Sequence, residues 1–120
     1  MMKVMRTIRQ GKIFSDKHPN LNRDWVIGDF IKDPMFQSEH FEFKFQHGDK
    51  GHFREPKEVL NPGCRTMCIL IHGKVRIKFV ESDSEHFIES QGDYVIWEPD
   101  EPHEFEFLEN TLVITLRWNK

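Results

Sequence analysis

Histidine and acidic side chains are the residues of this sequence with the clearest capacity for chemistry. Seven histidines are present, and a neutral imidazole can bind a divalent metal or take up a proton near neutral pH. His103 lies within an acidic stretch, residues 98–106, and could act as a general base beside one of these carboxylates. The sequence contains no nucleophile elbow, no glycine-rich phosphate loop and no metalloprotease pair of histidines. These residues therefore indicate no single reaction by themselves.

The two cysteines, Cys64 and Cys68, are separated by three residues. If they share a strand, their Cα atoms lie about 13 Å apart at ~3.3 Å per residue, which is too far for a disulfide. The neighbouring sequence offers no clear further pair of zinc ligands. We therefore expect two reduced, structural cysteines.

The elements that must position these side chains show the two-residue alternation typical of strands. In residues 41–47 three Phe and His47 share one face, and Glu, Lys and Gln share the other. We expect the Phe face to be buried, which would turn His47 inward. Alternation also predicts strands at residues 74–80, 103–107 and 111–118; two apolar runs, 67–71 and 93–97, are further strands, and 25–30 and 4–8 are weaker candidates.

Turn signals separate these runs at short intervals, at residues 72–74, 81–84, 91–93, 99–102 and 109–110. Many short strands with frequent turns indicate a sandwich or a barrel. The 120 residues fit a single domain. We expect N-terminal strands and irregular connections in residues 1–40, the latter at 13–23 and 35–39, and a barrel core in residues 41–118.

Charge and hydropathy bound the partners and the location. A net charge of −3 with scattered Lys and Arg gives no reason to expect nucleic acid as a partner. The longest apolar run, Met67 to Ile71, is far below the ~18 residues of a membrane span. No apolar stretch follows the first residues, so we expect no signal peptide and a soluble, cytoplasmic protein.

Residues 92–103, Gly-Asp-Tyr-Val-Ile-Trp-Glu-Pro-Asp-Glu-Pro-His, resemble the second conserved motif of the cupin superfamily. That motif combines a Gly-Asp turn, an apolar strand, a Pro-rich turn and a His that projects into the barrel. Upstream, Asn61-Pro62-Gly63 and the run 67–71 closing on Gly73 are similar to the frame of the first motif. The resemblance covers residues 61–107. It implies an all-β fold, a cupin-type jelly-roll β-barrel, and often a homodimer.

In many cupins two His and a Glu of the first motif, with the His of the second, hold a divalent metal. Here only His103 corresponds, because Thr66 stands at the Glu position and residues 59–62 contain no His. Since a catalytic metal normally has about three protein ligands, we expect no cofactor. A divalent metal would need a rewired site of His47, His103 and one carboxylate. The further candidate ligands are His52, Glu55, Glu58 and His72.

By the same resemblance, His103, Arg65, Thr66, Trp97 and Arg117 would gather at the barrel mouth, with His47 as a further ligand-binding candidate. Trp97 offers a flat apolar face for a ligand, and Arg65 could pair with a carboxylate or phosphate. Trp97 could equally be a core residue, and Arg117 could simply face solvent. We expect a cupin-like protein that binds a small molecule without the usual metal. The alternatives are a metal-dependent dioxygenase or isomerase with a rewired site including His103, and a metal-free isomerase or epimerase with His103 as base.

Overall fold

The computed structural model describes residues 8–13, 25–56, 63–99 and 101–119. These residues form strands and turns and contain no helix, hence none that is long and apolar enough to cross a membrane. The strands are β1 (Trp25–Ile27), β2 (Phe41–Gly48), β3 (Phe53–Arg54), β4 (Cys64–His72), β5 (Val75–Phe79), β6 (Ser84–Ile88), β7 (Tyr94–Trp97), β8 (His103–Phe107) and β9 (Thr111–Asn119).

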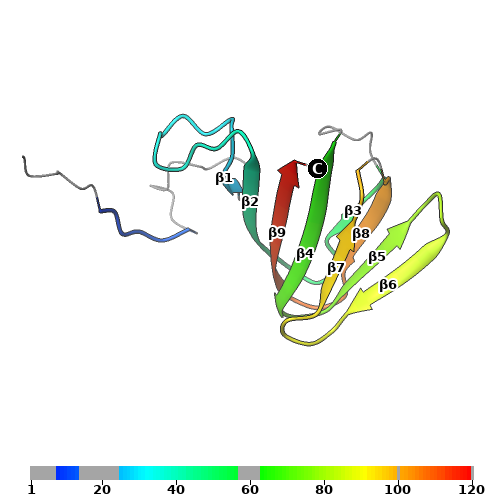
Figure 1. Ribbon diagram of the computed structural model, residues 1–120. Coiled ribbons are helices and arrows are strands. Elements are labelled where there is room, and N and C mark those ends of the chain that lie inside the picture. Colours follow the sequence, from blue (N-terminus) through cyan, green and yellow to red (C-terminus); the bar gives the residue numbers. More distant parts are fainter. Residues whose placement is uncertain (1–7, 14–24, 57–62, 100, 120) are drawn as a thin grey trace, which may run out of the picture.

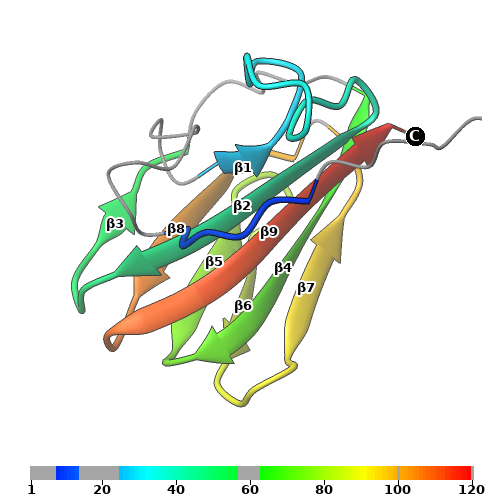
Figure 2. The same ribbon diagram turned by 90° about the vertical axis from the view of Figure 1, so that its left-hand side faces the viewer.

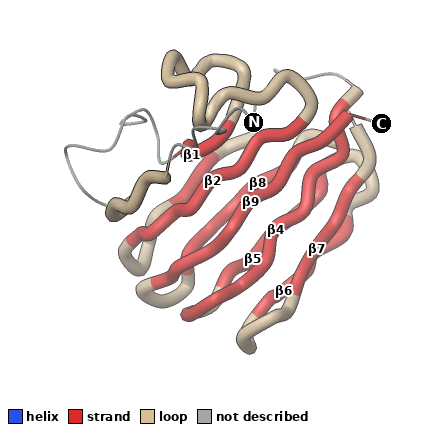
Figure 3. The backbone as a smooth tube through the Cα atoms, turned by 60° about the vertical axis from the view of Figure 1, so that its left-hand side comes forward, coloured by secondary structure: helices blue, strands red, loops and turns tan. Residues whose placement is uncertain are grey.

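The strands form two antiparallel sheets that pack face to face as a jelly roll (Figures 1 and 2). One sheet has the order β1-β2-β9-β4-β7, and the other has the order β3-β8-β5-β6. Most neighbouring strands come from distant parts of the chain, as β4 between β9 and β7 illustrates (Figure 3), whereas β1 with β2 and β5 with β6 are consecutive. The all-β jelly-roll prediction is therefore confirmed.

The predicted strands from residue 41 onward are present, with ends that differ by a few residues. Of the weaker strand candidate at 25–30, only residues 25–27 form a strand, β1. Of the candidate at 4–8, only Ile8 lies within the described residues, and it is exposed. Residues 35–39 form an irregular connection as expected, whereas residues 14–23 lie outside the described part. The two-residue strand β3 was not predicted, and neither was β6, which lies between the predicted turns at residues 81–84 and 91–93.

The apolar core lies between the sheets and is built from alternate residues of facing strands. Buried side chains from β4, β5, β6, β8 and β9 form it, with Val95 and Trp97 of β7 packed against them. Burial of this apolar surface is the main force that holds the sheets together. Its members are Cys68, Leu70, Val75, Ile77, Phe79, Ile88, Phe105, Phe107 and Val113.

Strand pairing decides which face of β2 and β9 points toward this core. Cys68 of β4 is buried, pairs with Thr115 of β9, and Thr115 pairs with Lys44 of β2. Directly paired residues share one face of an antiparallel sheet. The polar residues Lys44 and Thr115 therefore face the inside of the fold.

The prediction that the Phe face of residues 41–47 is buried inside the fold is wrong. Phe43 and Phe45 stack at 6.4 Å on the outer face of the sheet, and His47 on the same face is exposed. Two apolar rows cross four strands there, and we call these eight residues the outer apolar face. They are Phe43, Leu116, Met67 and Ile96 in one row, and Phe45, Ile114, Ile69 and Tyr94 in the other.

Candidate ligand-binding cavity

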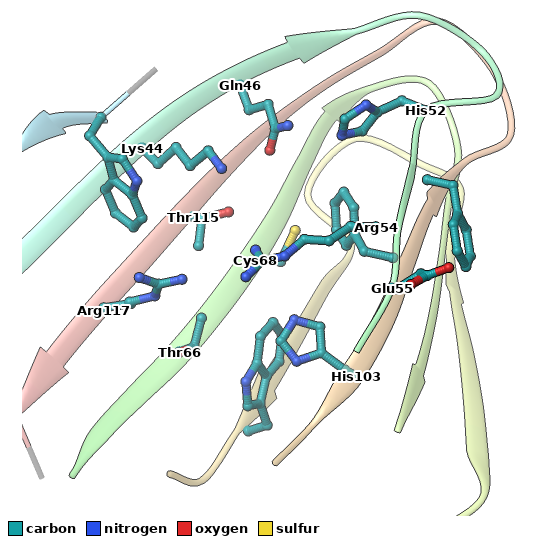
Figure 4. A pocket seen from close by; sticks show the side chains of 14 residues that line it. Lys44, Gln46, His52, Arg54, Glu55, Thr66, Cys68, His103, Thr115 and Arg117 are labelled. Atoms are coloured by element: carbon teal, nitrogen blue, oxygen red, sulfur yellow. The ribbon is translucent and has the colours of Figure 1, made fainter. Parts of the chain in front are cut away.

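A cavity of about 650 Å³ lies between the two sheets, beside the apolar core (Figure 4). Strands of both sheets contribute to its wall. Aromatic rings, three cationic side chains and a few neutral polar groups line it together. The lining residues are Trp25, Lys44, Gln46, His52, Phe53, Arg54, Glu55, Thr66, Cys68, Trp97, His103, Phe105, Thr115 and Arg117.

Single strands run from the core into the cavity, which explains how the sequence builds both. In β8, His103 and Phe105 line the cavity, and Phe107, the next residue on the same face, lies in the core. In β9 the core residue Val113 precedes Thr115 and Arg117 on that face. Because side chains alternate between faces, one strand supplies apolar anchors at one end and polar groups at the other.

The imidazole of His103 is held between a backbone carbonyl and an aromatic ring. Its Nδ1 lies 3.0 Å from the carbonyl oxygen of Glu101, and its ring centroid lies 4.8 Å from that of Trp97. A carbonyl oxygen only accepts hydrogen bonds, so Nδ1 carries the proton and donates it. The neutral imidazole then has Nε2 as its acceptor.

Burial lowers the pKa of His103 below its usual value, and the positive charges of Arg54 and Arg117 lower it further. The hydrogen bond to the Glu101 carbonyl raises this pKa, but its effect is smaller than that of burial. Burial and the neighbouring cations both disfavour the protonated, positively charged form of the imidazole. His103 is therefore neutral at neutral pH.

Lys44, Arg54 and Arg117 direct their charged ends into the cavity from three strands of the two sheets (Figure 4). The Arg117 guanidinium lies 4.6 Å from the ring centroid of Trp25, and the Lys44 ammonium lies 5.5 Å from it. Arg117 also lies 3.5 Å from a carboxylate oxygen of Glu42. The indole face thus stabilises two neighbouring cations that would otherwise repel one another.

The structure brings only some of the predicted site residues together. His103, Thr66 and Trp97 line the cavity, and so does Arg117, which excludes its interpretation as a residue that only faces solvent. The ring centroid of Trp97 also lies 5.4 Å from that of the core residue Phe79. Trp97 therefore both packs against the core and lines the cavity.

Arg65 and His47 do not line the cavity. Arg65 follows Cys64 on β4 and is next to Thr66, so it lies on the opposite face, where its Nε is 3.3 Å from Glu98 Oε2. His47 lies on the outer face of β2 for the register reason given above. The alternating pattern placed His47 inward by assuming that the more apolar face is the inner one, whereas the cupin resemblance placed Arg65 at the barrel mouth.

The other candidate ligands are also dispersed. His52 and Glu55 line the cavity at exposed positions, His72 is exposed at the end of β4, and Glu58 lies outside the described residues. Glu104 and Glu106, the two carboxylates on the same strand as His103, lie 3.3 and 3.1 Å from Arg76. The acidic residues of β8 therefore pair with Arg76.

The cavity does not fit the divalent metal that the cupin resemblance implies. Within residues 8–13, 25–56, 63–99 and 101–119, no three His, Cys, Asp or Glu side chains are grouped as metal ligands. Burial raises the pKa of the Cys68 thiol to about 12, so it is not a thiolate ligand at neutral pH. The three cations nearby would add repulsion toward a further positive ion.

Sequence reasoning missed Lys44, Arg54, Trp25 and Thr115 as lining residues. Lys44 and Thr115 lie on the less apolar face of their predicted strands, and alternation gives no reason to place that face inside. Arg54 belongs to a two-residue strand with no periodic signal. Only the register of β2 on β9 would have identified the first two.

Comparisons with known proteins support the fold. No protein-family model matches the sequence, and no curated protein matches it. Among solved structures, a cupin superfamily protein from Desulfitobacterium hafniense is similar with a TM-score of 0.60 and 13% identity, over 70% of this chain and 72% of that one.

Two named proteins show the same likeness. KdgF from Halomonas sp. is similar with a TM-score of 0.59 and 15% identity, over 69% of this chain and 72% of that one. The DMSP lyase DddQ from Ruegeria pomeroyi is similar with a TM-score of 0.56 and 14% identity, over 71% of this chain and 41% of that one. The chain therefore has the cupin jelly-roll fold, and identities this low establish the fold alone.

Proposed function

We propose that this protein binds a small organic molecule in the cavity between its sheets and that it does so without a resident metal. The observation that carries the proposal is the cavity itself, about 650 Å³ with aromatic walls and a few polar groups. Ligand pockets typically measure about 300–1,000 Å³ and combine these two kinds of lining. A binding or sensor module needs nothing further.

The metal-dependent alternative has little support from the described residues. Its first two candidate ligands lie on opposite sides of the five-stranded sheet: His103 lines the cavity, and His47 is exposed on the outer face. His52 and Glu55 remain near the cavity, but no described group of three potential ligands includes them. We therefore keep metal-free binding as the proposal.

Proton transfer by His103 is a second candidate function. Its Nε2 is an acceptor, because Nδ1 donates to Glu101, and it belongs to a side chain that lines the cavity. Tyr94, the single Tyr of the chain, is 58% exposed on the outer apolar face and is not an available partner. If a bound carbon acid exchanges hydrogen with D₂O, the exchange should be lost in His103→Gln while binding persists.

The binding proposal is tested by closing the cavity. Thr66→Phe places a ring into the cavity from β4, and Arg65→Phe places the same ring on the opposite face of the same strand. Small molecules that raise the melting temperature of the parent protein should fail to do so for Thr66→Phe and should still act on Arg65→Phe. Equal responses of the two folded variants would contradict binding in this cavity.

Metal content is measured separately, by elemental analysis, on the parent protein and on His103→Ala, both purified without a chelator. We expect a metal content well below one equivalent in both proteins. Near-stoichiometric metal that disappears in His103→Ala would replace the proposal with the rewired metalloenzyme.

We also propose a cytoplasmic homodimer that pairs through the outer apolar face. Tyr94 and Ile96 at the edge strand β7 are 58% and 49% exposed. An exposed apolar face of this kind is typical of an interaction site. A second copy fits it because sheet faces stack on one another with interdigitated side chains, and each copy brings the same two rows.

A further inference from the structure

Two threonine side chains are buried in the described part of the chain, and their hydroxyl groups differ in hydrogen bonding. Thr111 is fully buried, and its hydroxyl donates to the Glu109 carbonyl at 2.8 Å. Thr66 is 7% exposed, and no described residue forms a hydrogen bond with its hydroxyl. A buried hydroxyl without a partner is costly. Because Thr66 lines the cavity, a molecule bound there can supply the partner.

The imidazole of His103 is a second polar group of the cavity with an unused hydrogen-bonding position. Its Nδ1 donates to the Glu101 carbonyl at 3.0 Å, and its ring packs against Phe79 and Trp97. Within the part of the chain that the structure describes, no group donates to Nε2. A neutral imidazole only accepts at this atom, so its partner must be a group that carries a donor hydrogen.

Trp97 adjoins both of these polar groups. It is the direct partner of Thr66 in the pairing of β7 with β4, and its ring centroid lies 4.8 Å from that of His103. Directly paired residues share one face of a sheet, and Thr66 and His103 both project into the cavity (Figure 4). Two polar groups with unused positions, one on β4 and one on β8, therefore border one indole ring.

From this arrangement we infer that the ligand is a ring compound with a hydroxyl group that donates to Nε2 of His103 and accepts from the hydroxyl of Thr66. The inference rests on the proposed function, because it names the ligand class of the same cavity. A hydroxyl both donates and accepts, so one group serves both side chains. A ketone or an ether only accepts and would leave Nε2 unpaired in a buried site. The ring packs on Trp97, because an indole face favours flat or apolar groups.

The test compares probes of similar size that differ in the donor. Cyclohexanol and cyclohexanone have the same ring, but only the alcohol donates a hydrogen bond. Phenol, anisole and aniline make the same comparison on a flat ring, and aniline supplies an N–H donor in place of the O–H. Dissociation constants are obtained from NMR titrations of the labelled full chain.

Two pairs of variants identify the protein groups that are involved. His103→Phe removes the acceptor and keeps a ring in the cavity. His86→Phe is its matched control, because the His86 ring lies 5.7 Å from the same Phe79 but is exposed on β6, and His86 is not among the lining residues of the cavity. Thr66→Val removes only the hydroxyl. Thr111→Val is its control, because that hydroxyl already donates to a backbone carbonyl.

We expect cyclohexanol to bind about 5-fold or more tightly than cyclohexanone, and phenol likewise than anisole. His103→Phe should abolish this preference, whereas His86→Phe should retain it. Thr66→Val should weaken the binding of alcohol and ketone alike, because both accept a hydrogen bond from the threonine. Without a probe, Thr66→Val should leave the melting temperature unchanged or raise it, and Thr111→Val should lower it, because only Thr111 loses a formed hydrogen bond.

A ketone and an ether that bind as tightly as the alcohols would overturn the inference and leave the proposed function standing. A preference that survives in His103→Phe would also overturn it, because Nε2 would then not be the acceptor. Tighter binding of aniline than of phenol would overturn the assignment of a hydroxyl. If no probe binds to the folded parent protein, the inference fails, and the comparison of Thr66→Phe with Arg65→Phe still decides the proposed function by itself.

Discussion

Replacing Gly73 with alanine should destabilise the protein far more than the same replacement at Gly92. Both glycines lie in turns with positive φ, 104° for Gly73 between β4 and β5 and 89° for Gly92 before β7. They differ in the space around them. A Cβ at Gly73 would lie 2.4 Å from Thr111 Oγ1 and 2.6 Å from the carbonyl oxygen of Asn110, whereas a Cβ at Gly92 would meet nothing within 4 Å.

Two costs add at Gly73 and only one applies at Gly92. A non-glycine residue in such a backbone conformation costs about 1–3 kcal/mol, and this cost is common to both. Overpacking against neighbours that cannot move costs about 1–3 kcal/mol more. Thr111 cannot move freely, since it is fully buried and its hydroxyl donates to the Glu109 carbonyl at 2.8 Å.

The Gly73→Ala change should therefore cost about 2–6 kcal/mol, against about 1–3 kcal/mol for Gly92→Ala. The free energy of unfolding of a native domain is about 5–15 kcal/mol in total. Gly73→Ala should therefore lower the stability substantially or unfold the chain. Equilibrium urea unfolding followed by circular dichroism gives the free energy of unfolding of each variant. A Gly73→Ala variant as stable as Gly92→Ala would refute the steric argument.

Three further predictions concern titration, thiol reactivity and assembly. Because the pKa of His103 is lowered by burial, the unfolded chain binds more protons than the folded one below pH ~6.5. The free energy of unfolding should consequently fall as the pH drops through this range, and His103→Gln should flatten that part of the profile; an unchanged profile would contradict the assignment. Cys64 should react with a thiol reagent in native buffer at pH 8 far faster than Cys68, because Cys68 is buried and the pKa of its thiol is about 12; two equally fast thiols would be the contrary result. Ile96→Glu should shift the protein from dimer to monomer in light scattering, whereas the exposed Phe87→Glu on β6 of the other sheet should not. A parent protein that is already monomeric would contradict the dimer proposal.

The sequence alone determined where most of the longer strands and their turns lie. Alternation in residues 103–107 matches β8, and the Gly-Asp signal at residues 92–93 marks the turn before β7. These features are local, because the two-residue period and the positive φ of a glycine depend on neighbouring residues only. The expectation of two reduced cysteines depended on the condition that Cys64 and Cys68 share a strand, which β4 meets, and both thiols are free.

Only the tertiary structure decided which face of each strand points inward. The alternating pattern shows that β2 has an apolar and a polar face, and an outer apolar face looks the same in sequence as a core. The register of Lys44 on Thr115 and of Thr115 on the buried Cys68 turns the polar face into the cavity. That register depends on contacts between residues 47 and 71 positions apart. As a result His47 and Arg65 point outward, while Lys44, Arg54 and Arg117 line the cavity.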